Sequence, residues 1–319
     1  MGKRIAVLTS GGDAPGMNAC IRAVVRSGLA YGHEMFGIYS GYKGLIDDQI
    51  EPLNRSSVSE IINRGGTILG TARLPEFKNP EVLARAVEIL KRHDIDAIIG
   101  IGGDGTYRGL ADLSKLGVQT IGLPGTIDND IASTDYTIGF DTCLNTIVDC
   151  VDKLRDTSSS HQRCSIVEVM GNKAGDLAAY AGLACGAELV ITSETNFNKE
   201  EVIEFLRQQR RAGKKHAIVL ISEKITDVHL LAKEIQEETG YGARAEVLGH
   251  MQRGGTPSAN DRILASRLGE YAIQLLNKNV TSVCCGIVEN QLKYYNIYDA
   301  LKLPRKSTID IIKVTKRIG

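Results

Sequence analysis

A strand that breaks into glycines constrains this chain more than any other stretch of its sequence. The apolar run at residues 98–101 is typical of a strand buried on both faces, and GGDGT at 102–106 follows it directly. A helical pattern marked by Leu110 and Leu113 comes next. Glycines at such a junction leave backbone N–H groups bare at the positive end of a helix dipole, so the sequence predicts a site for a polyanion.

Acidic side chains stand at this turn and at the next one. Asp104 lies among the glycines, where it would repel a phosphate unless a cation lay between them, and this predicts Mg²⁺. One βα unit later, residues 118–123 predict a second strand, PGT at 124–126 ends it, and Asp128 and Asp130 follow. Two carboxylates beside a phosphate site suit a general base for a hydroxyl and a partner that holds the metal. Each feature alone is more often an ordinary turn, and only their combination points to catalysis.

Four motifs resemble one known family closely. GGDGTYRG at 102–109, PGTIDNDI at 124–131, TIGFDT at 137–142 and GHMQRGGTP at 249–257 are similar to signature stretches of the bacterial ATP-dependent 6-phosphofructokinases. GGDGT alone also occurs in NAD kinases and diacylglycerol kinases, whereas PGTIDND with TIGFDT is specific. The resemblance covers nearly the whole chain and fades after about Ile287. It implies an allosterically regulated enzyme of glycolysis that phosphorylates fructose 6-phosphate to fructose 1,6-bisphosphate with ATP.

Composition argues against several other classes of protein. The 319 residues suffice for two domains, and 38 basic against 38 acidic residues give no net charge that would favour nucleic acid or an anionic membrane. The seven cysteines show no CxxC pair or metal-ligand spacing, which is typical of reduced, mostly buried thiols. No signal peptide, long apolar span or lipidation motif is recognisable, so we expect a cytoplasmic protein with no membrane and no nucleic acid among its partners.

Strand and helix patterns alternate along the chain, which predicts an α/β fold with helices on both faces of parallel sheets. We expect two Rossmann-like, three-layer α/β/α domains with mainly parallel sheets and a cleft between them. Locally, the sequence predicts loops at 41–44 and 157–161 and a short helix at 58–63. The domains that the resemblance implies are an ATP-binding domain at 1–140 plus about 253–306 and a fructose 6-phosphate-binding domain at 141–252 plus about 307–319.

A second glycine-rich turn, GGDAPG at 11–16, also joins a predicted strand to a helix, and it is neither a P-loop nor a GxGxxG fingerprint. The resemblance assigns both turns to ATP as co-substrate. Leu74 stands where many family members have cysteine, and because that contact is largely backbone and steric we expect little effect. The implied nucleotide-binding residues are Gly12, Tyr42, Arg73, Leu74, Phe77, Gly102, Gly103, Asp104, Gly105, Thr106 and Gly109.

The resemblance also assigns the catalytic groups. Asp128 takes the proton from the 1-hydroxyl of the sugar, and Thr126 stabilises the phosphoryl group in transit. Asp104 and Asp130 hold Mg²⁺ near the nucleotide phosphates.

Charged residues at or just beyond the ends of predicted strands make a second cluster. Open α/β sheets bind ligands at the carboxyl ends of their strands, and guanidinium groups bind phosphate bidentately. Each arginine alone is more often a surface salt-bridge partner, and His250 a hydrogen-bonded core residue. The resemblance implies that Arg163 and Arg244 come from a neighbouring subunit of a homotetramer. The implied fructose 6-phosphate residues are Thr126, Asp128, Asp130, Arg163, Met170, Gly171, Asn172, Glu223, Arg244, His250 and Arg253.

Asn172 departs from the family, which carries at this position an arginine that stabilises the transferring phosphoryl group. Removing such a preorganised cation lowers a rate on the order of a hundredfold. Lys173 is adjacent, but neighbouring side chains point in different directions. A catalytically weakened metabolite sensor of the same fold therefore stays open as an alternative to an active kinase.

The family's effector site, for ADP or phosphoenolpyruvate, is also matched. From the residues alone, Arg22 and Arg26 on one helix face are more often a solvated stripe. Glu60 stands where aspartate is usual, and Ala212 replaces a basic residue, so we expect allosteric control with altered affinity or preference. The implied effector residues are Arg22, Arg26, Arg55, Ser59, Glu60, Arg155, Gly186, Glu188, Lys214, Lys215 and His216.

Other interpretations explain less of the sequence. In pyrophosphate-dependent relatives the positions of Gly105 and Gly125 carry aspartate and lysine, which occupy the space of the nucleotide, whereas glycines leave room for ATP. An NAD or lipid kinase that shares only GGDGT leaves PGTIDND unexplained. A Rossmann oxidoreductase is disfavoured, because the sequence lacks the GxGxxG fingerprint and has acids where the pyrophosphate of the cofactor would lie.

Overall fold

A computed structural model describes residues 2–318 of the chain. The chain divides into two compact units, which are described separately. Unit 1 consists of Met1–Thr142 and Arg253–Arg305, and unit 2 of Cys143–Gln252 and Lys306–Gly319. The roles predicted for two domains, ATP binding and fructose 6-phosphate binding, stay predictions.

Unit 1 is built on one sheet, in which the described residues form seven strands in the order β11-β10-β5-β4-β1-β2-β3. The inner strands pair in parallel, while β3 and β11 run antiparallel at the two edges. The inner strands are apolar along their length because helices cover both faces of the sheet. The strands are β1 (Arg4–Ser10), β2 (Glu34–Ile38), β3 (Ile50–Leu53), β4 (Ala97–Gly102), β5 (Gln119–Pro124), β10 (Val283–Val288) and β11 (Gln291–Asn296).

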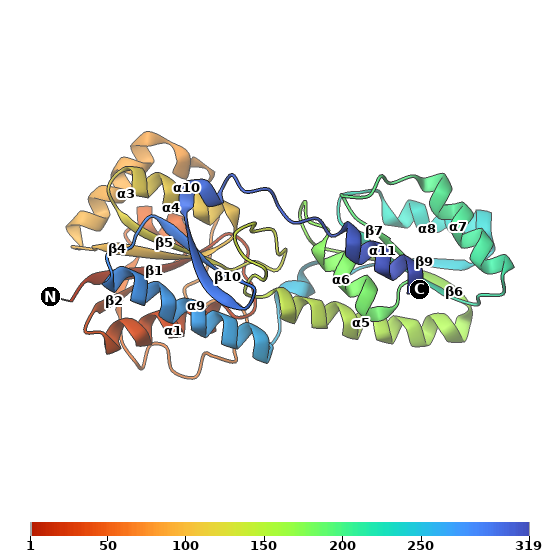
Figure 1. Ribbon diagram of the computed structural model, residues 1–319, viewed down its shortest axis with the longest axis horizontal. Coiled ribbons are helices and arrows are strands. Elements are labelled where there is room, and N and C mark those ends of the chain that lie inside the picture. Colours follow the sequence, from red (N-terminus) through yellow and green to blue (C-terminus); the bar gives the residue numbers. More distant parts are fainter. Residues whose placement is uncertain (1, 319) are drawn as a thin grey trace. The chain divides into compact units, whose positions relative to one another are not determined.

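The helices of unit 1 complete a three-layer arrangement. Figure 1 shows α3, α4 and α10 on one side of the sheet and α1 and α9 on the other. α1 and α9 approach closely at Gly269, where an added Cβ would lie 2.7 Å from Ala23 Cβ. The helices are α1 (Met17–Ala30), α2 (Gly41–Ile46), η1 (Pro75–Lys78), α3 (Pro80–Arg92), α4 (Asp104–Lys115), α9 (Ala259–Asn277) and α10 (Ile297–Ala300).

The strand order of unit 1 reverses beside β1. From β1 the chain proceeds outward to β2 and β3, and it then returns to form β4 on the opposite side of β1. Connections that leave two adjacent parallel strands in opposite directions open a crevice at the strands' carboxyl ends, where such sheets bind ligands. The turns at 11–16 and 102–106 follow β1 and β4, so both glycine-rich turns belong to this crevice.

Unit 2 contains a smaller sheet, in which the described strands run in parallel in the order β7-β8-β6-β9. α7 and α8 cover one face, while α5 and α6 lie on the other and α11 packs against α6 and β7 (Figure 1). The elements are α5 (Phe140–His161, which begins in unit 1), β6 (Arg163–Val169), α6 (Asp176–Cys185), β7 (Leu189–Ile191), α7 (Lys199–Arg211), β8 (Ala217–Ser222), α8 (Val228–Thr239), β9 (Gly242–Val247), η2 (Gly249–Arg253) and α11 (Ile309–Ile318).

The predicted α/β class with mainly parallel sheets is confirmed, but three local predictions are wrong. Residues 41–44 begin α2 instead of a loop, because the helix buries Tyr42 and Leu45 in the core. Residues 58–63 are a series of turns, since Glu60 has a left-handed backbone (φ 56°) that a helix does not allow. The polar stretch at 157–161 continues α5 to its end.

No helix within residues 2–318 combines the length and the apolar character needed to cross a bilayer. The seven cysteines are free thiols, and Cys20, Cys143, Cys164, Cys284 and Cys285 are buried. Burial raises the pKa of Cys164 to about 12, so its reactive thiolate form is scarce at neutral pH. Free and mostly buried cysteines agree with the prediction of reduced, mostly buried thiols.

Gly269→Ala tests the close packing of α1 and α9. Alanine normally stabilises a helix interior relative to glycine by about 1 kcal/mol. Here the new methyl group would lie 2.7 Å from Ala23 Cβ and 3.0 Å from the Cys20 carbonyl oxygen. We therefore expect urea denaturation to show a loss of about 1–3 kcal/mol in the free energy of unfolding. Gly105→Ala, whose Cβ meets no described atom within 4 Å, is the control and should lose nothing; equal stability of the two variants would contradict the packing argument.

Candidate active site

The glycine-rich turns of unit 1 meet because three strands end side by side. Gly102 at the end of β4 pairs with Ser10 on β1 and with Pro124 on β5. The Gly125 N–H donates to the Gly102 carbonyl (3.0 Å), and the Thr106 hydroxyl donates to the Ser10 carbonyl (3.0 Å). The segments predicted to hold a polyphosphate and to carry the acids therefore leave one edge of the sheet at neighbouring positions.

The first turn of α4 presents backbone donors at that edge. α4 begins at Asp104, and no side chain of residues 2–318 caps it at Gly103. The N–H groups of a first helical turn and the helix dipole both favour an anion. A Cβ built at Gly105 meets no described atom within 4 Å, so the space over this turn is open. These are the properties that the sequence predicts for a phosphate site.

Tyr42, Phe77 and Gly109 form a wall beside this turn. The two rings stack with centroids 4.1 Å apart, and the Tyr42 hydroxyl donates to the Thr106 carbonyl (2.6 Å). A side chain at Gly109 would collide with the Tyr42 ring, so this glycine allows the ring to lie against α4. Leu74 is half-buried against the same core. The structure thus brings together the predicted nucleotide residues on the loop before α3 and those on α4.

The turn after β1 lies against an arginine from the second segment of unit 1. The Arg253 guanidinium donates to the Asp13 carbonyl (3.2 Å), and a Cβ at Gly12 would collide with it. Arg253, predicted to bind the sugar phosphate, therefore neighbours Gly12, predicted to bind ATP. Arg73 lies exposed on the loop before η1.

The acidic loop after β5 holds its two aspartates in different surroundings. Thr126 and Asp128 are each 8% exposed, whereas Asp130 is half-buried. The Asp128 N–H donates to the Thr126 hydroxyl (3.2 Å). Asn129 between the aspartates has a left-handed backbone (φ 52°), which turns the chain sharply. An enclosed carboxylate next to a more open one suits the two predicted roles, base and metal partner.

The carboxylates of Asp104 and Asp130 have the donor chemistry that Mg²⁺ prefers. Asp104 pairs with Arg108 across one turn of α4 (2.7 Å), and its side chain is half exposed. Within the described part of the chain, no three His, Cys, Asp or Glu side chains gather as a metal centre. Mg²⁺ does not require such a cage, because it keeps several waters and takes one or two carboxylates together with substrate phosphates. The residues present therefore fit this ion.

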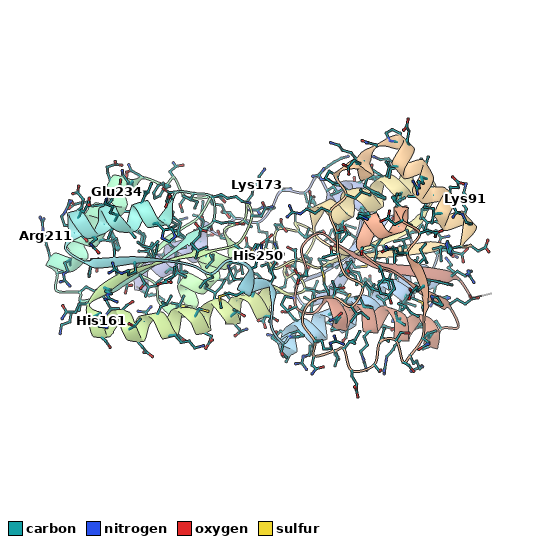
Figure 2. The ribbon with its side chains drawn as sticks, turned by 180° about the vertical axis from the view of Figure 1, so that it is seen from behind. Lys91, His161, Lys173, Arg211, Glu234 and His250 are labelled. Carbon is teal, nitrogen blue, oxygen red and sulfur yellow. The ribbon has the colours of Figure 1, made fainter. Side chains whose placement is uncertain are left out.

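In unit 2, predicted substrate residues gather at the carboxyl ends of the strands. The Asn172 N–H donates to Glu223 Oε1 (2.8 Å), which joins the segments after β6 and β8. The Met170 N–H donates to Gln252 Oε1 in η2 (3.1 Å). His250 on η2 is exposed rather than part of the core (Figure 2). The residues at this edge are Met170, Gly171, Asn172, Glu223 and His250.

Asn172, where the resembled family carries arginine, is fixed by its neighbours. Lys224 Nζ donates to Asn172 Oδ1 (3.4 Å) and lies 3.7 Å from Glu223 Oε1. Burial first, and then the charge of Glu223, raise the pKa of Glu168 on β6. This edge of unit 2 therefore carries carboxylates that can accept hydrogen bonds from hydroxyl groups.

Arg163 and Arg244 do not lie at the carboxyl ends of their strands, and that expectation is wrong. Arg163 begins β6, and Arg244 lies inside β9, which runs from Gly242 to Val247. The register pairs Arg163 with Gly242 and Arg244 with Ser165, so both arginines lie toward the amino ends. Within one chain, these two arginines lie toward the amino ends of the strands, whereas Glu223 lies at the carboxyl ends.

The effector residues predicted in unit 2 form a connected group. The Arg155 guanidinium donates to the Gly186 carbonyl (3.1 Å). Glu188 is 7% exposed, pairs with Lys214 Nζ (2.9 Å) and accepts a hydrogen bond from the Ile218 N–H (2.5 Å). Lys215 and His216 follow Lys214 in the loop before β8.

The effector residues predicted in unit 1 lie on α1 and after β3. Burial first, and then the charge of Arg26, lower the pKa of Arg22. Arg26 Nε is buried and meets no acceptor among residues 2–318. A buried donor beside a like charge is compatible with an anion site, and the effector role of these residues stays a prediction. Arg55, Ser59 and Glu60 are exposed in the turns that follow β3.

Sequence reasoning missed residues that hold the acidic segment in place. Asp261, 1% exposed, accepts hydrogen bonds from the N–H groups of Gly139 and Thr142 (2.8 Å each) and from the Thr142 hydroxyl (2.5 Å). Burial raises the pKa of Asp261, and these hydrogen bonds oppose the rise. The Ser258 hydroxyl accepts from the Asp261 N–H at the start of α9 (3.2 Å). The spacing S-x-x-D, a helix-capping signal, could have marked this position.

Comparisons with known proteins agree on one family. The family described as phosphofructokinase matches residues 4–276. The chain is 57% identical over 319 residues to the ATP-dependent 6-phosphofructokinase of Aliivibrio salmonicida (strain LFI1238), with 100% of both chains covered. It is 57% identical over 318 residues to the ATP-dependent 6-phosphofructokinase of Haemophilus influenzae (strain 86-028NP), with 99% of both covered.

Solved structures give the same result. Phosphofructokinase from Saccharomyces cerevisiae is similar with a TM-score of 0.86 and 33% identity over 98% of this chain and 47% of that chain. This chain therefore spans about half the length of the Saccharomyces chain. The pyrophosphate-dependent phosphofructokinase from Marinobacter aquaeolei has a TM-score of 0.88 at 22% identity, over 98% of this chain and 88% of that one, and is a likeness of fold alone.

Proposed function

The chain belongs to the phosphofructokinase family, and we propose that it phosphorylates fructose 6-phosphate with ATP, giving fructose 1,6-bisphosphate in glycolysis. The observation that carries this proposal is the meeting of an open, glycine-bare helix start with the Asp128 loop at one edge of the unit 1 sheet. A coupled assay with ATP, Mg²⁺ and fructose 6-phosphate tests it directly. Absence of fructose 1,6-bisphosphate in that assay would support a metabolite sensor of the same fold instead.

Unit 1 binds the donor in this proposal. The N–H groups at the start of α4 and the turn at Gly12 hold the polyphosphate, and the exposed Arg73 reaches it as a mobile cation. Tyr42 and Phe77 shape the wall of the nucleotide site. These groups position the γ-phosphoryl group, and positioning is the main contribution a protein makes to phosphoryl transfer.

Asp128 acts as the general base. It accepts the proton of the sugar 1-hydroxyl as that oxygen attacks the γ-phosphorus, and ADP leaves. The Thr126 hydroxyl and nearby backbone donors stabilise the phosphoryl group in transit. The enclosure of Asp128 supports this role, since little water can compete with the substrate hydroxyl for a carboxylate that is 8% exposed.

Mg²⁺ is the proposed cofactor, with Asp104 and Asp130 as its protein partners. When bound, it supplies charge neutralisation for the nucleotide phosphates. The ion pair between Asp104 and Arg108 is half exposed, so Asp104 can turn toward a cation with little loss.

The sugar phosphate site draws on residues of several segments. Glu223 accepts hydrogen bonds from sugar hydroxyls, and His250 and Arg253 contribute to binding. Arg163 and Arg244 bind the phosphate of a substrate held by a neighbouring copy, so we propose a homotetramer. Their place toward the amino ends of β6 and β9 supports this, because a single chain separates them from Glu223.

Allosteric control and cytoplasmic location complete the proposal. ADP or phosphoenolpyruvate binds the predicted effector residues, and the unmet donor of Arg26 and the cations around Glu188 support an anion there. Free thiols at every cysteine suit a reducing compartment such as the cytoplasm.

ATP rather than pyrophosphate is the proposed donor, and the surroundings of Gly105 support this. Space over Gly105 is open, so an aspartate there would occupy the nucleotide's place. Gly125 is less informative, because an added Cβ would lie 2.8 Å from Ile101 Cγ2 and 3.2 Å from Met17 Cε. Packing of the core alone explains glycine at that position.

Asp128→Ser should lower kcat by a factor on the order of 10²–10⁴, because the proton of the 1-hydroxyl loses its acceptor. The KM for fructose 6-phosphate should change little, since the base acts in the transition state. Steady-state kinetics measure both constants. Asp310→Ser, at a carboxylate whose side chain is 93% exposed on α11, is the control and should leave both unchanged. Preserved turnover in Asp128→Ser would refute the assignment of this base.

Gly105→Asp should raise the KM for ATP roughly tenfold or more, because its charge lies close to the nucleotide phosphates. Stability should not fall, since a carboxylate is favourable in the first turn of α4. Gly105→Asn has the same shape without the charge and should have a smaller effect. An unchanged KM for ATP in Gly105→Asp would mean that the nucleotide lies elsewhere.

Asn172→Arg should raise kcat, by up to about a hundredfold, because it restores a cation near the transferring phosphoryl group. The left-handed backbone at this residue (φ 54°) should lower stability by about 1 kcal/mol. Asn172→Lys, which adds charge without the planar fork, separates charge from geometry. An equal or lower kcat in Asn172→Arg would show that the chain already compensates for the missing arginine.

A further inference from the structure

The loop at residues 126–138, here called the acidic loop, is closed at its base by backbone hydrogen bonds. The Thr126 N–H donates to the Ile138 carbonyl (3.1 Å), and the Ile138 N–H donates to the Pro124 carbonyl (2.8 Å). The two ends of the loop therefore lie side by side at the end of β5. Asp128 lies inside this closed loop.

One buried side chain contacts the loop on both sides of Asp128. Thr137 is 0% exposed, and its hydroxyl donates to the Thr126 carbonyl (2.6 Å). Its N–H donates to Asn129 Oδ1 (2.9 Å), and its hydroxyl lies 3.4 Å from the same oxygen. Asn129 has a left-handed backbone (φ 52°), a conformation that asparagine tolerates better than most residues. Thr137 thus links Thr126, which lies two residues before Asp128, to Asn129, which directly follows it.

The outer arc of the acidic loop is held by a different set of contacts. The Asp135 N–H donates to the Ile287 carbonyl (2.7 Å), and the Ile287 N–H donates to the Thr134 hydroxyl (3.0 Å). The Asn129 amide donates to the Asp135 carbonyl (3.2 Å). These bonds join the arc to β10 without the Thr137 hydroxyl. Removing that hydroxyl should therefore loosen the inner part of the loop and leave the arc attached.

We propose that Thr137 is a positioning residue, which sets the carboxylate of Asp128 through Thr126 and Asn129. The inference rests on the proposed function, in which Asp128 is the base. A general base works only when its oxygen lies within hydrogen-bond reach of the proton, and a displacement of about 1 Å can lower a rate on the order of a hundredfold. Thr137 contacts the backbone before Asp128 and the side chain of the residue after it, so loss of its hydroxyl would allow that displacement.

A purely structural role for Thr137 makes different predictions. A buried hydroxyl that only stabilises the fold would lower the melting temperature and leave kcat of the folded protein unchanged. A positioning role lowers kcat while the KM for ATP stays the same, because the proposed nucleotide contacts lie outside the acidic loop. Kinetic constants of the folded variant therefore distinguish the two roles.

Thr137→Val and Thr137→Ser form the central pair of variants. Valine keeps the shape and removes the hydroxyl that donates to the Thr126 carbonyl, whereas serine keeps it. We expect Thr137→Val to lower kcat by about ten- to a hundredfold with the KM for ATP unchanged, and Thr137→Ser to recover most of that loss. Equal kcat in Thr137→Val and the unmodified chain would overturn the proposal, as would equal losses in both variants.

Thr239→Val is the matched control. Thr239 is also buried, at 8% exposed, and its hydroxyl donates to the Ile235 carbonyl at the same distance (2.6 Å), but it lies at the end of α8 in unit 2. Thr239→Val should lower stability by an amount similar to that of Thr137→Val and leave kcat unchanged. A kcat loss in Thr239→Val as large as in Thr137→Val would overturn the proposal, because loss of any buried hydroxyl would then suffice.

Asn129→Gly decides the question if Thr137→Val fails to fold. Glycine accepts the left-handed backbone of residue 129 and removes the side chain that Thr137 contacts. The same loss of kcat with an unchanged KM for ATP is expected, and unchanged kcat would overturn the proposal. The unmodified chain and Asp128→Ser are measured alongside. An inactive unmodified chain would refute the proposed function, whereas an active one that loses turnover in Asp128→Ser but not in Thr137→Val would refute only the positioning role.

Discussion

The register between β1, β4 and β5 is the constraint on which the rest of the structure depends. Gly102 pairs with Ser10 and with Pro124, so all three strands end at one level, and each then enters a glycine-containing turn. A slip of one residue would turn every side chain of a strand to the opposite face and bury the polar turn residues. The apolar runs of the three strands oppose such a slip, because helices cover both faces. Packing of the core therefore fixes the geometry of the turn at 102–106 and of the acidic loop together.

Features that depend on a few neighbouring residues could be predicted from the sequence. A buried run followed by glycines identifies both the strand and the turn after it, which is why the ends of β4 and β5 were found. The two arginines of unit 2 show where this reasoning stops. β9 starts at Gly242 because it pairs with β6 there, although its exposed residues give no apolar alternation. Because the start of β9 is defined by pairing rather than by pattern, the sequence did not show that Arg244 lies inside this strand and toward its amino end.

The partners of residues that fix the site from a distance in sequence were beyond prediction for a related reason. Asp261 accepts hydrogen bonds from Gly139 and Thr142, more than a hundred positions earlier, and Thr137 reaches back to Thr126. No local pattern encodes such partners, because the fold alone brings them together. A buried carboxylate without donors would be destabilising, so the hydrogen bonds to Asp261 also offset the cost of its burial. The same contacts that allow this burial fix the start of α5 next to the acidic loop.

The separation of the unit 2 residues bears on how a substrate could be held. Met170 follows β6 directly, while Arg163 begins it, and a strand rises about 3.3 Å per residue, so their backbones lie roughly 20 Å apart. Even a long arginine side chain and an extended sugar phosphate together do not span that length comfortably. If both sets of residues bind fructose 6-phosphate, they must act on different substrate molecules, each completed by a second copy of the chain. The location of two arginines on one strand pair thus links the catalytic proposal to the oligomer, since a lone subunit would lack two of the cations proposed to hold its sugar phosphate.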